Sequence, residues 1–158
     1  TLDAQLPGGN TVTALNDVVV EKRLTQHVVK LAFSVGSESL LSYRADAVIV
    51  ASPTGSTAYT FSAGGPLVDP ELEALVVTPV APHNLFGRPM VFRPTAELRF
   101  DVVDDRPARV NVDGRAVADL EPGQGVSVVR GAAASRFITF APRNFATAVR
   151  DKFHLHDA

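Results

Sequence analysis

The stretch Ser-Pro-Thr-Gly-Ser-Thr-Ala-Tyr at residues 52–59 places hydroxyl side chains directly after the apolar run Ala-Val-Ile-Val-Ala. Pro53 ends a strand, Gly55 permits backbone geometry that other residues avoid, and Ser56 or Thr57 can cap a helix. The hydroxyls and the free N–H groups of such a helix could bind a polar ligand. The stretch lacks the lysine of a P-loop and the second glycine of a Gly-x-Ser-x-Gly nucleophile elbow. Two interpretations remain, a capped helix after a strand and a nucleoside-binding loop.

A second polar pair, Asn16-Asp17, interrupts the segment Ala-Leu-Asn-Asp-Val-Val-Val. An amide beside a carboxylate can bind a base edge and ribose hydroxyls, because the amide donates and accepts while the carboxylate accepts strongly. Taken alone, a turn or bulge is the simpler explanation, since Asn and Asp are common turn residues. Asp46 precedes an apolar strand beside Arg44, and its carboxylate either pairs with that arginine or faces a ligand.

The other titratable candidates are more ambiguous. Asp113 in Val-Asp-Gly is explained most simply as a hairpin-turn residue, and His83 in a proline-containing loop could be structural or functional. His154 and His156 lie in the C-terminal tail, where we expect no fixed partner. The spacing of His, Asp and Glu predicts no zinc site formed by the protein and assigns no Ser–His–Asp triad.

The composition favours one globular domain. The chain has 158 residues, 46% of them hydrophobic and 20% charged, so a buried core is expected rather than disorder. A net charge of −2 with scattered Lys and Arg argues against a nucleic-acid partner. The lack of Cys excludes disulfides and fits a cytoplasmic location. No apolar run reaches the roughly 18 residues of a membrane span, and no leader segment is recognisable. The chain starts without Met, as an excised domain would.

The elements that would position these residues are mostly strands. Period-2 alternation and β-branched residues predict strands within residues 11–22, 27–35, 97–105, 108–117, 125–131 and 136–142. Asp113-Gly114 is placed as the two-residue turn of a hairpin. The 11 Pro and 11 Gly punctuate these segments at short intervals, which is typical of an all-β sandwich or barrel. Helices are expected at 57–65, at 69–75 with Asp69 as the N-cap, and at 144–153.

Four segments occur together, in this order, in one protein family: residues 14–20, 43–70, 81–91 and 110–115. They resemble the C-terminal domain of bacterial NAD kinases, and the resemblance runs from about Ala14 to the Phe-rich end of the chain. It implies a mainly β, two-sheet, sandwich-like domain with a few short helices, covering residues 1–158. It also implies transfer of the γ-phosphoryl group of ATP, or of polyphosphate, to the 2′-hydroxyl of the adenosine ribose of NAD, which yields NADP. Mg²⁺ or another divalent cation would accompany the donor.

The resemblance also implies a set of NAD-binding residues. Asn16 and Asp17 match the pair that contacts the adenosine and its ribose, and Asp46 matches a carboxylate that reaches the nicotinamide amide from a neighbouring subunit. Homo-dimers or homo-tetramers are therefore expected. The positions that would line the adenine pocket or the nicotinamide and ribose regions are Thr54, Thr57, Ala58, Tyr59 and Ser62, followed by Ala81 and Asp113.

One departure from the family pattern concerns catalysis. The family's catalytic Asp belongs to a Gly-Gly-Asp-Gly loop in an N-terminal α/β domain, whereas this chain contains only Gly8-Gly9-Asn10 and Gly64-Gly65-Pro66. Phosphoryl transfer needs a group that orients the nucleophile. We therefore expect NAD recognition without catalysis in the isolated chain. A non-catalytic adenine-nucleotide-binding module is the alternative, and a lipid kinase of the sphingosine and diacylglycerol kinase group is a third possibility.

Overall fold

The computed structural model describes residues 1–24, 26–140 and 144–155, and its main feature is a pair of antiparallel six-stranded sheets. The first sheet has the order β2 (Thr11–Ala14), β1 (Leu2–Gln5), β12 (Gly125–Arg130), β9 (Leu98–Val102), β4 (Val29–Val35) and β5 (Glu38–Ala45). The second has the order β11 (Arg115–Leu120), β10 (Ala108–Val112), β3 (Asp17–Lys22), β6 (Ala47–Ala51), β7 (Leu75–Val80) and β8 (Met90–Phe92). The expected mainly β, two-sheet class is confirmed.

The main core lies between the two sheets, where alternate side chains of most strands point inward. In β4, Leu31 and Phe33 are fully buried while the intervening residues are more exposed, as the sequence alternation predicts. Phe33 stacks on Phe100 with ring centroids 4.7 Å apart and on Tyr43 at 6.0 Å. Burial raises the pKa of Tyr43 to about 12. These aromatic contacts join β9, β4 and the edge strand β5 at one end of the first sheet.

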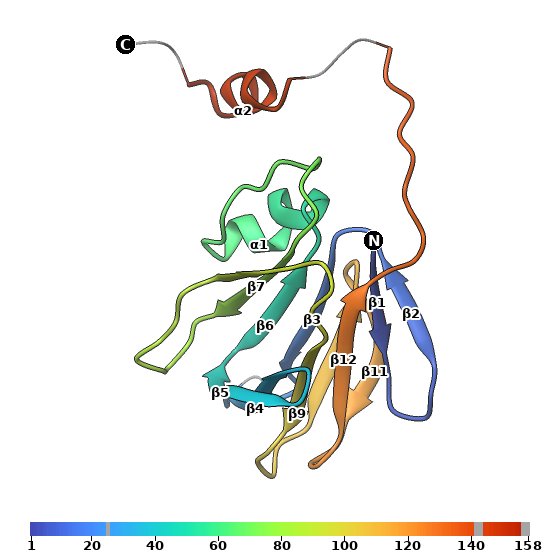
Figure 1. Cartoon of the computed structure of the whole chain (residues 1–158). Coiled ribbons are helices and arrows are strands. Elements are labelled where there is room, and N and C mark those ends of the chain that lie inside the picture. Colours follow the sequence, from blue (N-terminus) through green and yellow to red (C-terminus); the bar gives the residue numbers. More distant parts are fainter. Residues whose placement is uncertain (25, 141–143, 156–158) are drawn as a thin grey trace.

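The central strands of the second sheet are buried on both faces. Val19, Ile49 and Val76 point away from the main core and form a second cluster with Val68 and Ala63 from the segment between β6 and β7. This explains why residues 47–51 show a continuous apolar run instead of alternation. The segment that carries the hydroxyl-rich stretch therefore covers the outer face of this sheet (Figure 1).

The predicted hairpin at Asp113-Gly114 is confirmed, with φ values of 47° and 77° that match a two-residue turn of mirror-image type. The helix expected at 57–65 is only partly correct. The chain forms a 3₁₀ turn, η1 (Thr54–Thr57), and one turn of α-helix, α1 (Tyr59–Ser62), before Gly64 reverses it at φ 80°. Ala58, at ψ −130°, separates the two turns.

Two other elements differ from expectation. Residues 69–75 form a turn, because Asp69 caps only a local bend at Glu71 and strand β7 already begins at Leu75. The strand expected at 136–142 is absent from its described part, 136–140, which is extended without a partner strand. Ile138 and Phe140 in this part are 88% and 101% exposed. A strand needs a neighbour for its backbone bonds, and no described strand lies beside this segment.

The predicted C-terminal helix is confirmed as α2 (Phe145–Phe153). Asn144 caps it by accepting a hydrogen bond from the Thr147 N–H at 3.2 Å, and His154 ends it in the left-handed conformation. Residues 131–140 after β12 run extended, and α2 lies above α1 in Figure 1. Phe153 contacts Phe61 of α1 with ring centroids 5.0 Å apart. His156 lies outside the described residues.

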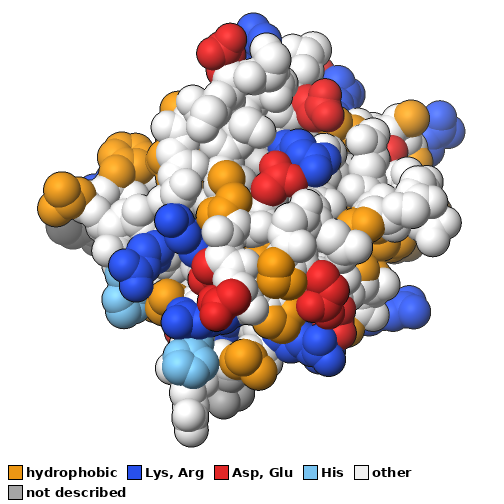
Figure 2. All heavy atoms as spheres, turned by 90° about the horizontal axis from the view of Figure 1, so that it is seen from below, with side chains coloured by type: hydrophobic (Ala, Val, Ile, Leu, Met, Phe, Trp, Pro, Cys, Tyr) orange, Lys and Arg blue, Asp and Glu red, His pale blue; other side chains and the backbone are white. Residues whose placement is uncertain are grey.

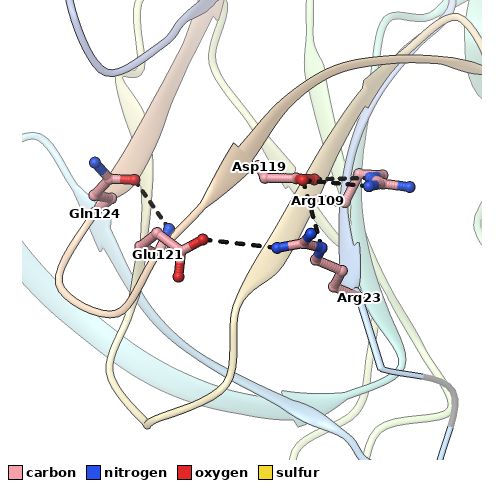
Figure 3. A network of polar contacts seen from close by, with 5 residues as sticks. All are labelled: Arg23, Arg109, Asp119, Glu121 and Gln124. Carbon is pink, nitrogen blue, oxygen red and sulfur yellow. Dashed lines mark hydrogen bonds and ion pairs between the residues drawn. The ribbon is translucent and has the colours of Figure 1, made fainter.

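Charged side chains of both signs are interspersed on the face shown in Figure 2. One cluster of them joins the end of β3 to the β10–β11 hairpin (Figure 3), since Asp119 pairs with Arg109 at 2.8 Å and with Arg23 at 3.4 Å. Glu121 lies 3.7 Å from Arg23 and is held by the side chain of Gln124. The Arg109 hydrogen bond lowers the pKa of Asp119. In the described part of the chain, no helix is long and apolar enough to cross a membrane.

Candidate functional site

The Asn16-Asp17 pair lies at the junction where β2 ends and β3 begins, and this junction is tied to the residue that follows β6. The Ser52 N–H donates to the Asn16 carbonyl oxygen at 2.9 Å, and the Ser52 hydroxyl donates to the Leu15 carbonyl oxygen at 2.6 Å. These bonds continue the ladder in which Asp17 pairs with Ala51. The two motifs singled out from the sequence therefore meet at one corner of the second sheet.

The loop after Ser52 packs against the same junction. Ser52 Oγ accepts a hydrogen bond from the Gly55 N–H at 3.1 Å, which folds the loop back toward β3. A Cβ atom placed on Gly55 would lie only 2.0 Å from the carbonyl oxygen of Asn16. The glycine is thus required for close approach of two backbones rather than for an unusual φ. Close approach of this kind is one established use of glycine.

Ser56, predicted as a possible helix cap, has a different role. Its buried hydroxyl accepts from the Val68 N–H at 3.0 Å and donates to the Val68 carbonyl oxygen at 3.3 Å. Neither short helical turn has a side-chain cap. The cap prediction is wrong because tertiary packing turns Ser56 inward. Its hydroxyl there bonds to the backbone of Val68, in the connection between β6 and β7.

Thr54 and Thr57 line a cavity of about 880 Å³ between η1 and α2. The Thr57 hydroxyl donates to the Thr54 carbonyl oxygen at 3.3 Å. The other walls come mainly from α2, together with Val68 and Pro70 from the connection between β6 and β7. Ligand pockets commonly fall between about 300 and 1,000 Å³, so this cavity is large enough for a nucleobase. Ser62 lies on the exposed face of α1.

Asp17 has an unusual electrostatic environment. Only 6% of its surface is exposed, and burial raises the pKa of its carboxyl group above the ordinary value of 3.8. The nearby carboxylate of Asp113 raises this pKa further, while a hydrogen bond from the Tyr59 backbone N–H lowers it. The Asp17 carboxylate therefore lies between the hairpin turn and the start of α1.

The Asp113 carboxylate is engaged by the protein backbone. Oδ2 accepts from the Leu15 N–H at 2.7 Å, and Oδ1 accepts from the N–H groups of Asn16 at 2.7 Å and Asp17 at 3.1 Å. The Asp113 N–H in turn donates to the Asp17 carbonyl oxygen at 3.0 Å. The hairpin turn is thus joined to the Asn16-Asp17 junction by four hydrogen bonds.

Asp46 and Ala81 lie at the opposite end of β6. Five residue steps of about 3.3 Å place Asp46 about 17 Å along the strand from Ala51. Of the two alternatives weighed for Asp46, pairing with Arg44 is not observed in the described residues, because its carboxylate pairs with Lys22 at 2.7 Å. The Asp46 N–H donates to the Val80 carbonyl oxygen at 3.0 Å, directly beside Ala81, which has a φ of 46°.

Tyr59 lies between the Asn16-Asp17 corner and Asp46: its backbone N–H bonds to Asp17, and the residue lines a cavity with Asp46. It lines a cavity of about 370 Å³ together with Glu21, Lys22, Arg23, Asp46, Ala47, Val80 and Arg109. Burial raises the pKa of the Tyr59 hydroxyl, and the carboxylates of Glu21, Asp46 and Asp17 raise it further. The exposed His83 lies in the loop after β7, where its backbone N–H donates to the Arg44 carbonyl oxygen at 2.7 Å.

The sequence interpretation missed several residues that shape the site. Ser52 joins the two motifs and Lys22 pairs with Asp46, but neither has a spacing that identifies its partner. Gly55 was singled out for unusual backbone geometry, and its close approach to Asn16 was not foreseen. The position of Ser52, directly after a buried strand, was the only available indication. Among the described residues, no group of three His, Asp or Glu side chains could hold a metal ion.

Two antiparallel sheets bring a hydroxyl-rich loop and an Asn-Asp junction to one corner, which defines a β domain with a polar candidate site. The sequence matches the family described as the ATP-NAD kinase C-terminal domain over residues 15–140, and the chain belongs to this family.

Relatives and solved structures agree with this assignment. The chain is 43% identical to NAD kinase 1 of Streptomyces avermitilis over 93% of its own length and 42% of that protein, and 43% identical to the NAD kinase of Heliobacterium modesticaldum over 88% and 50%. It is similar to yeast NADH kinase complexed with NADH (TM-score 0.76, 32% identity, 81% of this chain and 39% of that one). It also resembles an NAD kinase from Archaeoglobus fulgidus in complex with ATP (TM-score 0.71, 27% identity, 83% and 51%). The chain thus spans half or less of these two curated relatives.

Proposed function

We propose that this chain is the NAD-recognising domain of an NAD kinase, which transfers a phosphoryl group from ATP or polyphosphate to the 2′-hydroxyl of the adenosine ribose of NAD. The observation that carries the proposal is the bonding of the Asn16-Asp17 junction to Ser52 at the base of the hydroxyl-rich loop. Family membership and the two nucleotide complexes among the structural relatives support it.

The corner supplies the groups that an adenosine requires. The backbone of Asn16 carries the structural hydrogen bonds, and in the described part of the chain its side-chain amide has none, so the amide is available to a ligand. The Asp17 carboxylate is a strong acceptor for ribose hydroxyls. Thr54, Thr57 and Ala58 would line the adenine, since short hydroxyl side chains lose little conformational entropy when fixed. Tyr59 and Ser62 would complete the pocket wall.

The end of β6 at which Asp46 and Ala81 lie would bind the nicotinamide. We assign Asp46 and the backbone at Ala81 to this part of NAD, with the neighbouring subunit of a homo-dimer or homo-tetramer supplying them. Their location about 17 Å from the corner along β6 supports contact with a different part of the dinucleotide or with a different molecule of it. Lys22 would then have to release Asp46 or share it with the ligand.

Catalysis would require groups beyond this chain. We assign the catalytic base to an N-terminal domain bearing a Gly-Gly-Asp-Gly loop, because no Asp stands in the Gly-Gly segments here. Mg²⁺ or another divalent cation would enter with the phosphates of the donor and neutralise their charge. We place the enzyme in the cytoplasm.

The test combines calorimetry with an activity assay. This chain should bind NAD but form no NADP from NAD, ATP and Mg²⁺ above a heat-killed control, whereas the product of the complete reading frame should form NADP. Turnover by this chain would refute the assignment of the base to another domain. Binding without turnover by the complete product would favour the non-catalytic module.

A point variant tests the assignment of the corner. Asn16→Ala in the product of the complete reading frame should weaken NAD binding about tenfold, the effect of one lost hydrogen bond, with little change in thermal stability. Asn10→Ala is the matched control, because Asn10 lies in the exposed turn between β1 and β2. A loss of stability with unchanged affinity would restore the turn interpretation of Asn16.

A further inference from the structure

Asp113 occupies a position that the hairpin register fixes. Its neighbour Val112 pairs with Arg115 across the turn and with Val18 in β3. The turn therefore lies beside the start of β3. Asp113 has a φ of 47° and Gly114 a φ of 77°. Aspartate and asparagine are among the few residues other than glycine that adopt this conformation readily. The turn geometry by itself therefore accepts either residue.

The hydrogen bonds of the Asp113 carboxylate, in contrast, favour aspartate over asparagine at this position. Its oxygens accept hydrogen bonds from three consecutive backbone N–H groups, those of Leu15, Asn16 and Asp17. Successive N–H groups that converge in this way form an anion-binding concavity. Here the protein supplies its own anion from 96 to 98 residues along the chain.

The same junction is held from its carbonyl side by Ser52, through bonds to the carbonyl oxygens of Leu15 and Asn16. Asp113 and Ser52 together restrict the backbone at residues 15–17 from both sides. The directions in which the side chains of Asn16 and Asp17 leave the backbone follow from this restriction.

We propose that Asp113 is a positioning residue for nucleotide recognition, which orients Asn16 and Asp17 and makes no contact with NAD itself. The inference rests on the proposed function and replaces direct contact as the role of Asp113. Three of the roughly four acceptor sites of the carboxylate are already occupied by backbone N–H groups, which leaves little capacity for a ribose hydroxyl.

Asp113→Asn is the informative variant, because it keeps the side-chain size and the left-handed turn but replaces one acceptor oxygen with an NH₂ group. At least one of the three N–H groups then loses its acceptor. Asp119→Asn is the matched control, since Asp119 lies in the same hairpin and bonds to Arg109 instead. If Asp113→Asn does not fold, Asp113→Glu keeps the charge and displaces it by one methylene.

Two readouts are compared for the parent and both variants. Amide NMR of this chain reports the hydrogen bonds of Leu15, Asn16 and Asp17, and calorimetry on the product of the complete reading frame reports NAD affinity. For Asp113→Asn we expect upfield shifts and faster exchange at these three amides, with NAD affinity reduced at least tenfold. For Asp119→Asn we expect unchanged amides at 15–17 and affinity within twofold of the parent.

The outcomes separate the two proposals. If the parent binds NAD and Asp113→Asn binds it equally well, the positioning role is overturned while the proposed function stands. Weaker binding with unchanged amides at 15–17 also overturns it, because Asp113 would then contact NAD directly. If the parent binds no NAD, the proposed function fails and the positioning role fails with it.

Discussion

Gly55→Ala should damage both stability and recognition through one backbone contact. An added Cβ would lie 2.0 Å from the carbonyl oxygen, 2.5 Å from the carbonyl carbon and 2.7 Å from the Cα of Asn16. Real Cβ contacts shorter than 3.0 Å essentially do not occur, so the two backbones must separate by about 1 Å. The φ of Gly55 is not in the left-handed region, and the penalty is therefore steric.

The magnitude follows from what the shift disrupts. Overpacking a close contact costs about 1 to 3 kcal/mol. The displaced Asn16 carbonyl oxygen also loses its hydrogen bond from the buried Ser52, and a buried group left without a partner costs about 1 to 3 kcal/mol. We expect a loss of about 3 kcal/mol in the free energy of unfolding. For a domain of this size that lowers Tm by about 6 to 12 °C.

Thermal and urea unfolding of this chain measure the loss, with Gly36→Ala as the control. Gly36 has a φ of 58° and open space around its Cβ position, so alanine there adds only the left-handed penalty of about 1 to 2 kcal/mol. Calorimetry with NAD should show weaker binding for Gly55→Ala and unchanged binding for Gly36→Ala. A Gly55→Ala protein as stable as Gly36→Ala would refute the steric argument.

Two further variants probe the same corner. Ser56→Ala leaves the buried N–H of Val68 without an acceptor and should lower the free energy of unfolding by about 1 to 3 kcal/mol, measured by urea unfolding; an unchanged midpoint would contradict the role of the hydroxyl. Asp17→Asn should raise Tm at pH 7, because burial and Asp113 raise the pKa of Asp17 and its ionisation therefore destabilises the fold. Stability linked to protonated Asp17 is complete below pH 3.8 and is lost as pH rises through the folded-state pKa, so the advantage of the variant should vanish in acid. A Tm difference independent of pH would contradict this.

The alternation of apolar and polar residues predicted most strands correctly, because in a strand with one buried face every second side chain points into the core. The strand around Leu31 and Phe33 in β4 was predicted correctly for this reason. The Asp113-Gly114 turn was predicted correctly from residue type, because Asp and Gly tolerate positive φ. The same logic failed at residues 136–140, whose alternation is that of a strand but which have no neighbouring strand in the described structure. The helix at 69–75 failed because one local cap at Asp69 does not extend a helix when a strand begins at Leu75.

The sequence alone determined the mainly β class, the hydroxyl-rich loop after a buried strand and the Asn16-Asp17 pair, since these depend on residue types close together in the chain. Only the tertiary structure decided that Ser52 joins these motifs, that Gly55 must be glycine, and that Asp113 binds the backbone at residues 15–17. The physical reason is that such contacts connect residues 36 to 98 positions apart. Their geometry arises from strand register and sheet packing, which no local spacing specifies.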